Sequence, residues 1–90
     1  MKRFKAVISG RVQNVGFRMF ATTNALECDL TGEVRNLENG DVEVTVQGEQ
    51  PDIDRFMELT RKGNRFIRVD RIELTELPVN ANEKKFSYRW

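Results

Sequence analysis

The sequence predicts an α+β fold in which two helices lie on one face of an antiparallel sheet. Segments with the alternating apolar pattern of strands and segments with helical spacing follow one another in the order strand, helix, strand, strand, helix, strand. The chain of 90 residues also has room for only one small domain, which we expect to span residues 1–90. This order of elements in one domain is the split-βαβ, or ferredoxin-like, arrangement.

The N-terminal part of the chain predicts a strand followed by a helix. Residues 4–9 alternate with a period of two, which is the pattern of a strand with one buried face. From Phe17 onward the apolar residues recur at helical spacing. A helix should therefore begin near Gly16 and end around Asp29.

The middle of the chain predicts a β-hairpin. Two strand-like segments, at about residues 32–37 and 41–47, flank an Asn39-Gly40 pair. Asn-Gly is the strongest short hairpin signal, because both residues tolerate the left-handed backbone that a tight turn needs. In the second strand, three valines alternate with polar residues. We therefore expect one covered and one solvent-exposed face of the sheet.

A second helix and two further strands complete the predicted fold. Pro51 favours the first turn of a helix, and Gly63 is a typical helix stop. A long strand should run over about residues 66–77, with a bulge between Val69 and Ile72, where the apolar phase shifts. A loop should then lead to a short closing strand at about residues 86–90.

Charge and composition exclude several classes of function. The formal net charge is +1 with both signs interspersed, which argues against a nucleic-acid or membrane partner. With no histidine and one cysteine, Cys28, the chain cannot form a Ser-His-Asp triad or an internal disulfide, and a zinc site is disfavoured. No apolar stretch matches a signal core or a membrane span. We expect a cytoplasmic monomer.

The most informative segment of the chain is the run Gly10-Arg-Val-Gln-Asn-Val-Gly-Phe-Arg18, which joins the first strand to the first helix. The N-terminus of a helix presents unpaired backbone N–H groups and the positive end of the helix dipole, which together favour anions. Arg18 adds a planar cation in the first turn. This segment predicts a local site for a phosphoryl group.

This run and a second segment carry a family resemblance. The first run resembles the acylphosphatase signature G-x-V-Q-G-V-x-F-R, and residues 31–43, TGEVRNLENGDVE, resemble the T-G-W-V-x-N-x-x-D-G-x-V-E segment of the same family. Acylphosphatases are small enzymes that hydrolyse carboxyl phosphates and have the ferredoxin-like fold. The chain looks like a member over nearly its whole length.

The resemblance implies a function and a set of site residues. It implies hydrolysis of acyl phosphates such as acetyl phosphate to a carboxylate and inorganic phosphate, by direct attack of water and without a metal or cofactor. Arg18 would bind the phosphoryl oxygens and Asn36 would orient the water. The remaining donors would be backbone N–H groups that form a cradle, contributed by Gln13, Asn14, Val15, Gly16 and Phe17.

Some residues of the motif have other expected roles or depart from the family pattern. Asn14 stands where the family has glycine, and a backbone that only glycine adopts easily would cost it roughly 1–3 kcal/mol. We expect this to reduce turnover. The side chain of Gln13 is expected at the turn or the rim of the site, and Cys28 is expected to be a buried small residue.

Three other functions stay open at this point. The chain also resembles the N-terminal module of hydrogenase-maturation carbamoyltransferases, which would imply carbamoyl phosphate as the substrate. RNA-recognition domains share the fold, but they need aromatic side chains on the central strands, and residues 41–48 contain none. A non-catalytic, anion-sensing domain is the third alternative, and Asn14 is the only residue that favours it.

Overall fold

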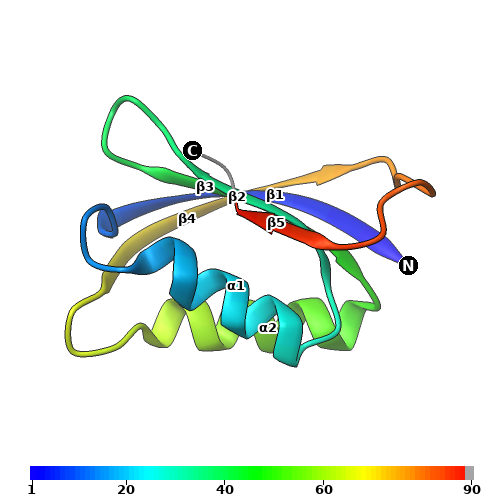
Figure 1. Ribbon diagram of the computed structural model, residues 1–90, viewed down its shortest axis with the longest axis horizontal. Helices are drawn as coiled ribbons and strands as arrows, with labels where there is room; N and C mark the ends of the chain where they lie inside the picture. Colours follow the sequence, from blue (N-terminus) through cyan, green and yellow to red (C-terminus); the bar gives the residue numbers. More distant parts are fainter. Residues whose placement is uncertain (89–90) are drawn as a thin grey trace.

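The computed structural model describes residues 1–88 and has the predicted arrangement of two layers (Figure 1). Both helices lie on the same face of a five-stranded sheet, whose strand order is β4-β1-β3-β2-β5. The antiparallel ferredoxin-like core is confirmed, and β5 adds one parallel pair with β2 that makes the sheet mixed. The elements are β1 (Lys2–Arg11), α1 (Phe17–Glu27), β2 (Thr31–Asn36), β3 (Val42–Gly48), α2 (Gln50–Lys62), β4 (Arg68–Leu77) and β5 (Phe86–Tyr88).

The predicted helix boundaries are close to the observed ones. α1 ends at Glu27, and Asp29 takes a left-handed backbone with φ 57°. The N–H of Asp29 bonds to the Leu26 carbonyl and the N–H of Leu30 to the Ala25 carbonyl, which is a Schellman cap. Aspartate therefore serves as the helix stop at a position where glycine would be the usual choice.

The start of β4 differs from the prediction. β4 begins at Arg68 and not at Phe66, because the Asn64 side chain accepts hydrogen bonds from the N–H groups of Phe66 and Ile67 at 2.8 and 3.0 Å. These bonds hold residues 64–67 in a turn. Farther along, Ser9 faces Arg71 and Gly10 faces Val69, so the predicted bulge in this strand is confirmed. β5 covers Phe86–Tyr88 of the predicted strand, and residues 89–90 lie outside the described part of the chain.

The predicted hairpin is present between β2 and β3. Its loop has three residues, and the Leu37 N–H closes it by donating to the Asp41 carbonyl at 2.9 Å. Gly40 has φ 97°, the positive value that the last position of such a loop requires. The loop therefore leaves Asn36 as the last residue of β2.

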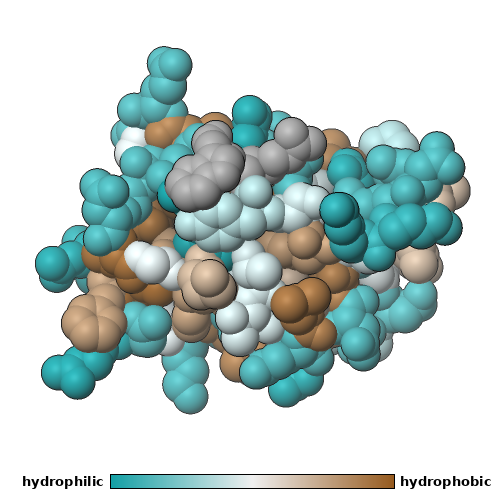
Figure 2. Space-filling view, in the orientation of Figure 1, coloured by the Kyte–Doolittle hydropathy of each residue, from teal (hydrophilic) through white to brown (hydrophobic). Residues whose placement is uncertain are grey.

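The hydrophobic core lies between the sheet and the two helices. Hydrophobic side chains gather in the middle of the face shown in Figure 2, and hydrophilic ones surround them at the rim. In α2 the buried residues are Ile53, Phe56, Met57 and Thr60. The alternating valines of β3 are buried, as are Ala6 and Ile8 of β1, while Phe4 is partly buried against the same core. The core includes Ala6, Ile8, Phe17, Ala21, Val34, Val42, Val44, Val46, Ile53, Phe56 and Met57.

The second face of the sheet is partly covered, contrary to the expectation of an exposed face. Thr45 and Gln47 of β3 point away from the helices, yet both are buried. The Gln47 side chain forms hydrogen bonds to the backbone N–H and carbonyl of Asn80 at 2.7 and 2.9 Å. The segment between β4 and β5 is thereby bound to this face.

A second contact attaches the same segment to the sheet. The Glu83 carboxylate accepts hydrogen bonds from Thr31 at 2.8 Å and from the Arg3 guanidinium at 3.3 Å. The side chains of Arg3 and Glu83 are only 18% and 13% exposed, so this ion pair is largely shielded from water. Burial of both charges makes each dependent on the other.

Within residues 1–88, no helix has the length and apolar character needed to cross a membrane.

We predict that Glu83→Ala lowers the free energy of unfolding by about 1–3 kcal/mol, because it leaves the Arg3 charge buried without its carboxylate. Glu76 forms a comparable pair with Lys2, but this pair is about half exposed. Glu76→Ala is therefore the matched control and should change the free energy of unfolding by less than about 0.5 kcal/mol. Urea unfolding of both variants measures the difference, and equal effects would contradict the prediction.

Candidate active site

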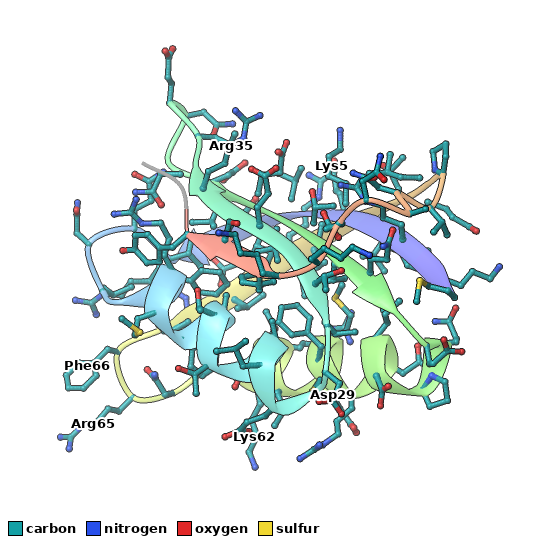
Figure 3. The ribbon with its side chains drawn as sticks, turned by 45° about the vertical axis from the view of Figure 1, so that its right-hand side comes forward. Lys5, Asp29, Arg35, Lys62, Arg65 and Phe66 are labelled. Atoms are coloured by element: carbon teal, nitrogen blue, oxygen red, sulfur yellow. The ribbon has the colours of Figure 1, made fainter. Side chains whose placement is uncertain are left out.

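Three loops lie at one end of the molecule, the left-hand end in Figure 1. They are the β1–α1 turn, the β2–β3 hairpin and the loop that joins α2 to β4. The predicted site residues lie in the first of these loops or directly beside the first two: Gln13, Asn14, Val15 and Gly16 in the turn, Phe17 and Arg18 at the start of α1, and Asn36 at the end of β2. The third carries Arg65 and Phe66, which project outward in Figure 3 and are exposed.

The β1–α1 turn, residues 12–16, has a backbone shape suited to anions. Val12 at its start is buried and anchors it to the core. Asn14 and Gly16 have positive φ values of 62° and 81°. A Cβ at Gly16 would meet no atom within 4 Å, so the backbone angle, and not crowding, explains the glycine. Turns that include left-handed residues can direct successive N–H groups toward one point.

Within residues 1–88, the N–H groups of residues 13–17 donate to no backbone carbonyl. The helix begins at the buried Phe17, and no side chain caps its N-terminus. In the described part of the chain, backbone hydrogen bonding in α1 starts with Phe20, whose N–H bonds to the Gly16 carbonyl at 3.0 Å. No acidic residue occupies the first turn. The positive end of α1 is therefore available to an external anion.

Arg18 lies in the first turn of α1 and is partly buried. Its guanidinium carbon is 4.6 Å from the centroid of the Tyr88 ring, a cation–π distance. Tyr88 belongs to β5 and pairs with Val34 of β2. This stacking places Arg18 beside the strand that carries Asn36, and the sequence contained no signal for the role of Tyr88.

Asn36 ends β2 on the same side of the sheet as the helices. Val34, two residues earlier, is fully buried in the core, and alternate residues of a strand face the same way. Asn36 itself is only partly buried. Among residues 1–88, its side-chain amide makes no hydrogen bond to another protein group, so both its donors and its acceptor are available to water.

The side chain of Gln13 has a role that the sequence analysis did not find. It was expected at the turn or the rim, but its Nε2 donates to the carbonyls of Leu37 and Asp41, each at 2.8 Å. Gln13 thereby connects the β1–α1 turn to the hairpin that follows Asn36. No local sequence pattern predicts this contact, because the two acceptor residues lie 24 and 28 positions away in the chain.

Three ionisable side chains, Arg35, Lys5 and Cys28, lie outside the site. Arg35 precedes Asn36 but lies on the opposite face of the sheet, as does Lys5 (Figure 3). A hydrogen bond from Arg35 to the Glu43 carboxylate raises the pKa of its guanidinium. Cys28 is buried at the far end of α1, and burial raises the pKa of its thiol above its usual range. Its predicted role as a small core residue is confirmed.

No three side chains of the types His, Cys, Asp and Glu come together as potential metal ligands within the described residues. The donors in the β1–α1 turn and the first turn of α1 are N–H groups and a guanidinium, and such groups bind anions. Donors of this kind suit a phosphoryl group.

Comparisons with known proteins agree with this geometry. The acylphosphatase family model matches residues 4–88. An acylphosphatase of Clostridium beijerinckii is 46% identical over 90 residues and is covered completely, as is this chain. The crystal structure of acylphosphatase from Bacillus subtilis has a TM-score of 0.94 at 32% identity, with 100% of both chains covered. Full-length HypF, in its phosphate- and nucleotide-bound form, is similar over 99% of this chain and 12% of that chain, with a TM-score of 0.86 at 31% identity. This chain therefore belongs to the acylphosphatase family.

Proposed function

We infer that this chain hydrolyses acyl phosphates, such as acetyl phosphate, to a carboxylate and inorganic phosphate by direct attack of water on phosphorus. The observation that carries this inference is the cluster of backbone N–H groups at residues 13–17, followed at once by Arg18 and lying beside the strand that ends at Asn36. Membership of the acylphosphatase family supports the same reaction.

The chemistry of the substrate explains why so few groups are enough. The leaving group is a carboxylate whose conjugate acid has a pKa of roughly 4, so it departs without a proton from the enzyme. The water oxygen bonds to phosphorus, the bond from phosphorus to the acyl oxygen breaks, and the protons of the water pass to phosphate oxygens and solvent. Positioning and charge neutralisation then supply most of the catalysis. A chain without histidine can provide both.

Each proposed site residue has one role in this reaction. The guanidinium of Arg18 binds two phosphoryl oxygens at once, and its contact with Tyr88 helps to keep it in place. The backbone cradle holds the remaining oxygens, and the helix dipole adds favourable potential. Asn36 holds the attacking water through its side-chain amide. The donors of the cradle are the N–H groups of Gln13, Asn14, Val15, Gly16 and Phe17.

The alternative functions can be separated by direct assays. Release of phosphate from acetyl, carbamoyl and benzoyl phosphates compares the substrate classes. Phosphate binding without turnover would favour an anion-sensing domain. Binding of single-stranded RNA is disfavoured, because β3 carries no aromatic residue and the segment that contains Asn80 covers part of its exposed face. A single domain over residues 1–90, a monomeric state, a cytoplasmic location and the lack of nucleic-acid and membrane partners stay predictions.

Replacement of Arg18 and replacement of Asn36 should have different effects on kcat and on phosphate affinity. Arg18 contacts the phosphoryl group in the ground and transition states, so Arg18→Ala should weaken inhibition by inorganic phosphate and lower kcat together. Arg18→Lys should restore little, because a point charge cannot replace the planar fork. Asn36 acts on the water, so Asn36→Ala should lower kcat by about 10²-fold with little change in phosphate affinity.

These kinetics are measured with acetyl phosphate, with inorganic phosphate as a competitive inhibitor. Circular dichroism confirms that each variant is folded, which matters because Asn36 borders the hairpin. Nearly full turnover by folded Asn36→Ala would contradict the role of this residue, and unchanged phosphate inhibition in Arg18→Ala would place the phosphoryl group elsewhere.

The proposed reaction needs no metal, because anionic oxygens are neutralised by N–H donors and a guanidinium. Hydrolysis of acetyl phosphate should therefore be unchanged in an excess of EDTA. Initial rates with and without the chelator test this. A loss of rate that added magnesium or zinc restores would overturn the metal-free mechanism.

The left-handed backbone conformation of Asn14 should lower the catalytic efficiency of the site. Its φ of 62° is accessible to asparagine but less costly for glycine, so Asn14→Gly should raise kcat/KM modestly. Asn14→Ala should lower the free energy of unfolding by about 1 kcal/mol, because alanine tolerates this conformation worse than asparagine. Steady-state kinetics and urea unfolding measure the two effects. A large drop in kcat/KM for Asn14→Gly would instead assign the asparagine side chain a role in binding.

A further inference from the structure

We propose that Gln13 is a positioning residue, whose side-chain amide holds the hairpin next to Asn36 at a set distance from the phosphate cradle. This inference rests on the proposed function, because it concerns the water that Asn36 orients. Gln13 takes part in both halves of the site. Its backbone N–H belongs to the cradle, and its side chain reaches the hairpin.

The contact consists of two hydrogen bonds from a single nitrogen. Nε2 of Gln13 donates to the carbonyl oxygens of Leu37 and Asp41, each at 2.8 Å. These two residues face each other at the base of the hairpin loop, where the Leu37 N–H donates to the Asp41 carbonyl. Each amide hydrogen thus has its own acceptor at an ordinary hydrogen-bond distance. The bond to Leu37 fixes the carbonyl of the residue that directly follows Asn36.

The Gln13 contact connects the β1–α1 turn to the β2–β3 hairpin, which the strand pairing of the sheet does not do at this end. β1 pairs with β3 only as far as Ile8, which faces Val42. Beyond this point, Gly10 and Arg11 pair with β4 alone, so β1 separates from the hairpin before the chain enters the turn. Within residues 1–88, the Gln13 amide makes the only side-chain hydrogen bonds between residues 12–16 and residues 36–42.

The two acceptors also determine which side chain can fill this place. Two carbonyl oxygens converge on one group, which must therefore offer two N–H donors and present no acceptor to them. A carboxylate at position 13 would present only acceptors and would repel both carbonyls. A methionine would fill a similar volume without any donor. Gln13→Glu and Gln13→Met therefore remove the same contact in two independent ways.

The catalytic consequence follows from the loose transition state of phosphoryl transfer. Because the reaction depends on the placement of water against phosphorus, a displacement of about 1 Å costs roughly 10²-fold in rate. Binding of the phosphoryl group depends instead on the cradle and Arg18. Loss of the Gln13 contact should therefore lower kcat and leave phosphate affinity nearly unchanged.

The experiment measures acetyl phosphate hydrolysis and inhibition by inorganic phosphate for the wild-type chain, Gln13→Met and Gln13→Glu. We expect kcat to fall by about 10- to 100-fold in both variants, with less than about a threefold change in the phosphate inhibition constant. Gln47→Met is the matched control. Gln47 also binds a distant backbone segment through two hydrogen bonds, but it does so on the far face of the sheet. The Gln47→Met variant should have a lower free energy of unfolding and an unchanged kcat.

A double variant distinguishes positioning from a general structural effect. If Gln13 acts through Asn36, then adding Gln13→Met to Asn36→Ala should lower kcat by less than about threefold further. A purely structural role would lower kcat by the same factor in both backgrounds, and that result would overturn the proposal. So would wild-type kcat in folded Gln13→Met and Gln13→Glu.

Different experimental results would contradict the proposed function and the positioning role of Gln13. A wild-type chain that releases no phosphate from any acyl phosphate would contradict the function itself. If the wild type and Asn36→Ala behave as expected while the Gln13 variants keep full kcat, only the positioning role of Gln13 is lost.

Discussion

The site depends on one constraint, which is that the β1–α1 turn must keep its backbone N–H groups away from protein acceptors. Such groups usually bond within the protein, because leaving them unpaired is costly once water is removed. Two buried side chains, Val12 at the start of the turn and Phe17 directly after it, hold the turn against the core at both ends. The left-handed conformations of Asn14 and Gly16 then direct the chain outward between these anchors. The packing of the core thus holds in place the turn that we propose as the anion site.

The rest of the fold arranges side chains around this turn. Both helices cover one face of the sheet, so the positive end of α1 lies next to the end of β2 (Figure 1). β5 adds to the edge of the sheet beside β2, and its Tyr88 supports the guanidinium of Arg18. A largely shielded ion pair between Arg3 and Glu83 binds the segment that leads into β5 to the far face of the sheet. The position of Tyr88 therefore depends on contacts on both faces.

The proposed chemistry explains why the chain can be nearly neutral and still bind a phosphoryl group. Long-range attraction of a polyanion needs a broad basic surface, and the net charge of +1 provides none. A single phosphoryl group needs only a few donors at short range, which backbone N–H groups and one arginine supply. A good leaving group removes the need for a general acid. The Gln13 contact adds the one requirement that remains, a fixed separation between the anion and the water.

The sequence by itself determined the elements, the family and the candidate residues. Strand alternation, helical spacing and the stop near Asp29 depend on backbone preferences over a few residues, and each predicted its element. The motif placed Arg18 on α1 and Asn36 at the end of β2 for the same local reason.

Tertiary structure decided the contacts between distant segments. The parallel pairing of β5 with β2, the burial of Gln47 under Asn80 and the two bonds from Gln13 to the hairpin all join residues far apart in the chain. β4 also begins later than predicted, because the Asn64 side chain holds the preceding residues in a turn. A glutamine in a loop has many possible partners, and only the register of the strands and the path of the backbone select among them. Periodicity carries no information about that selection.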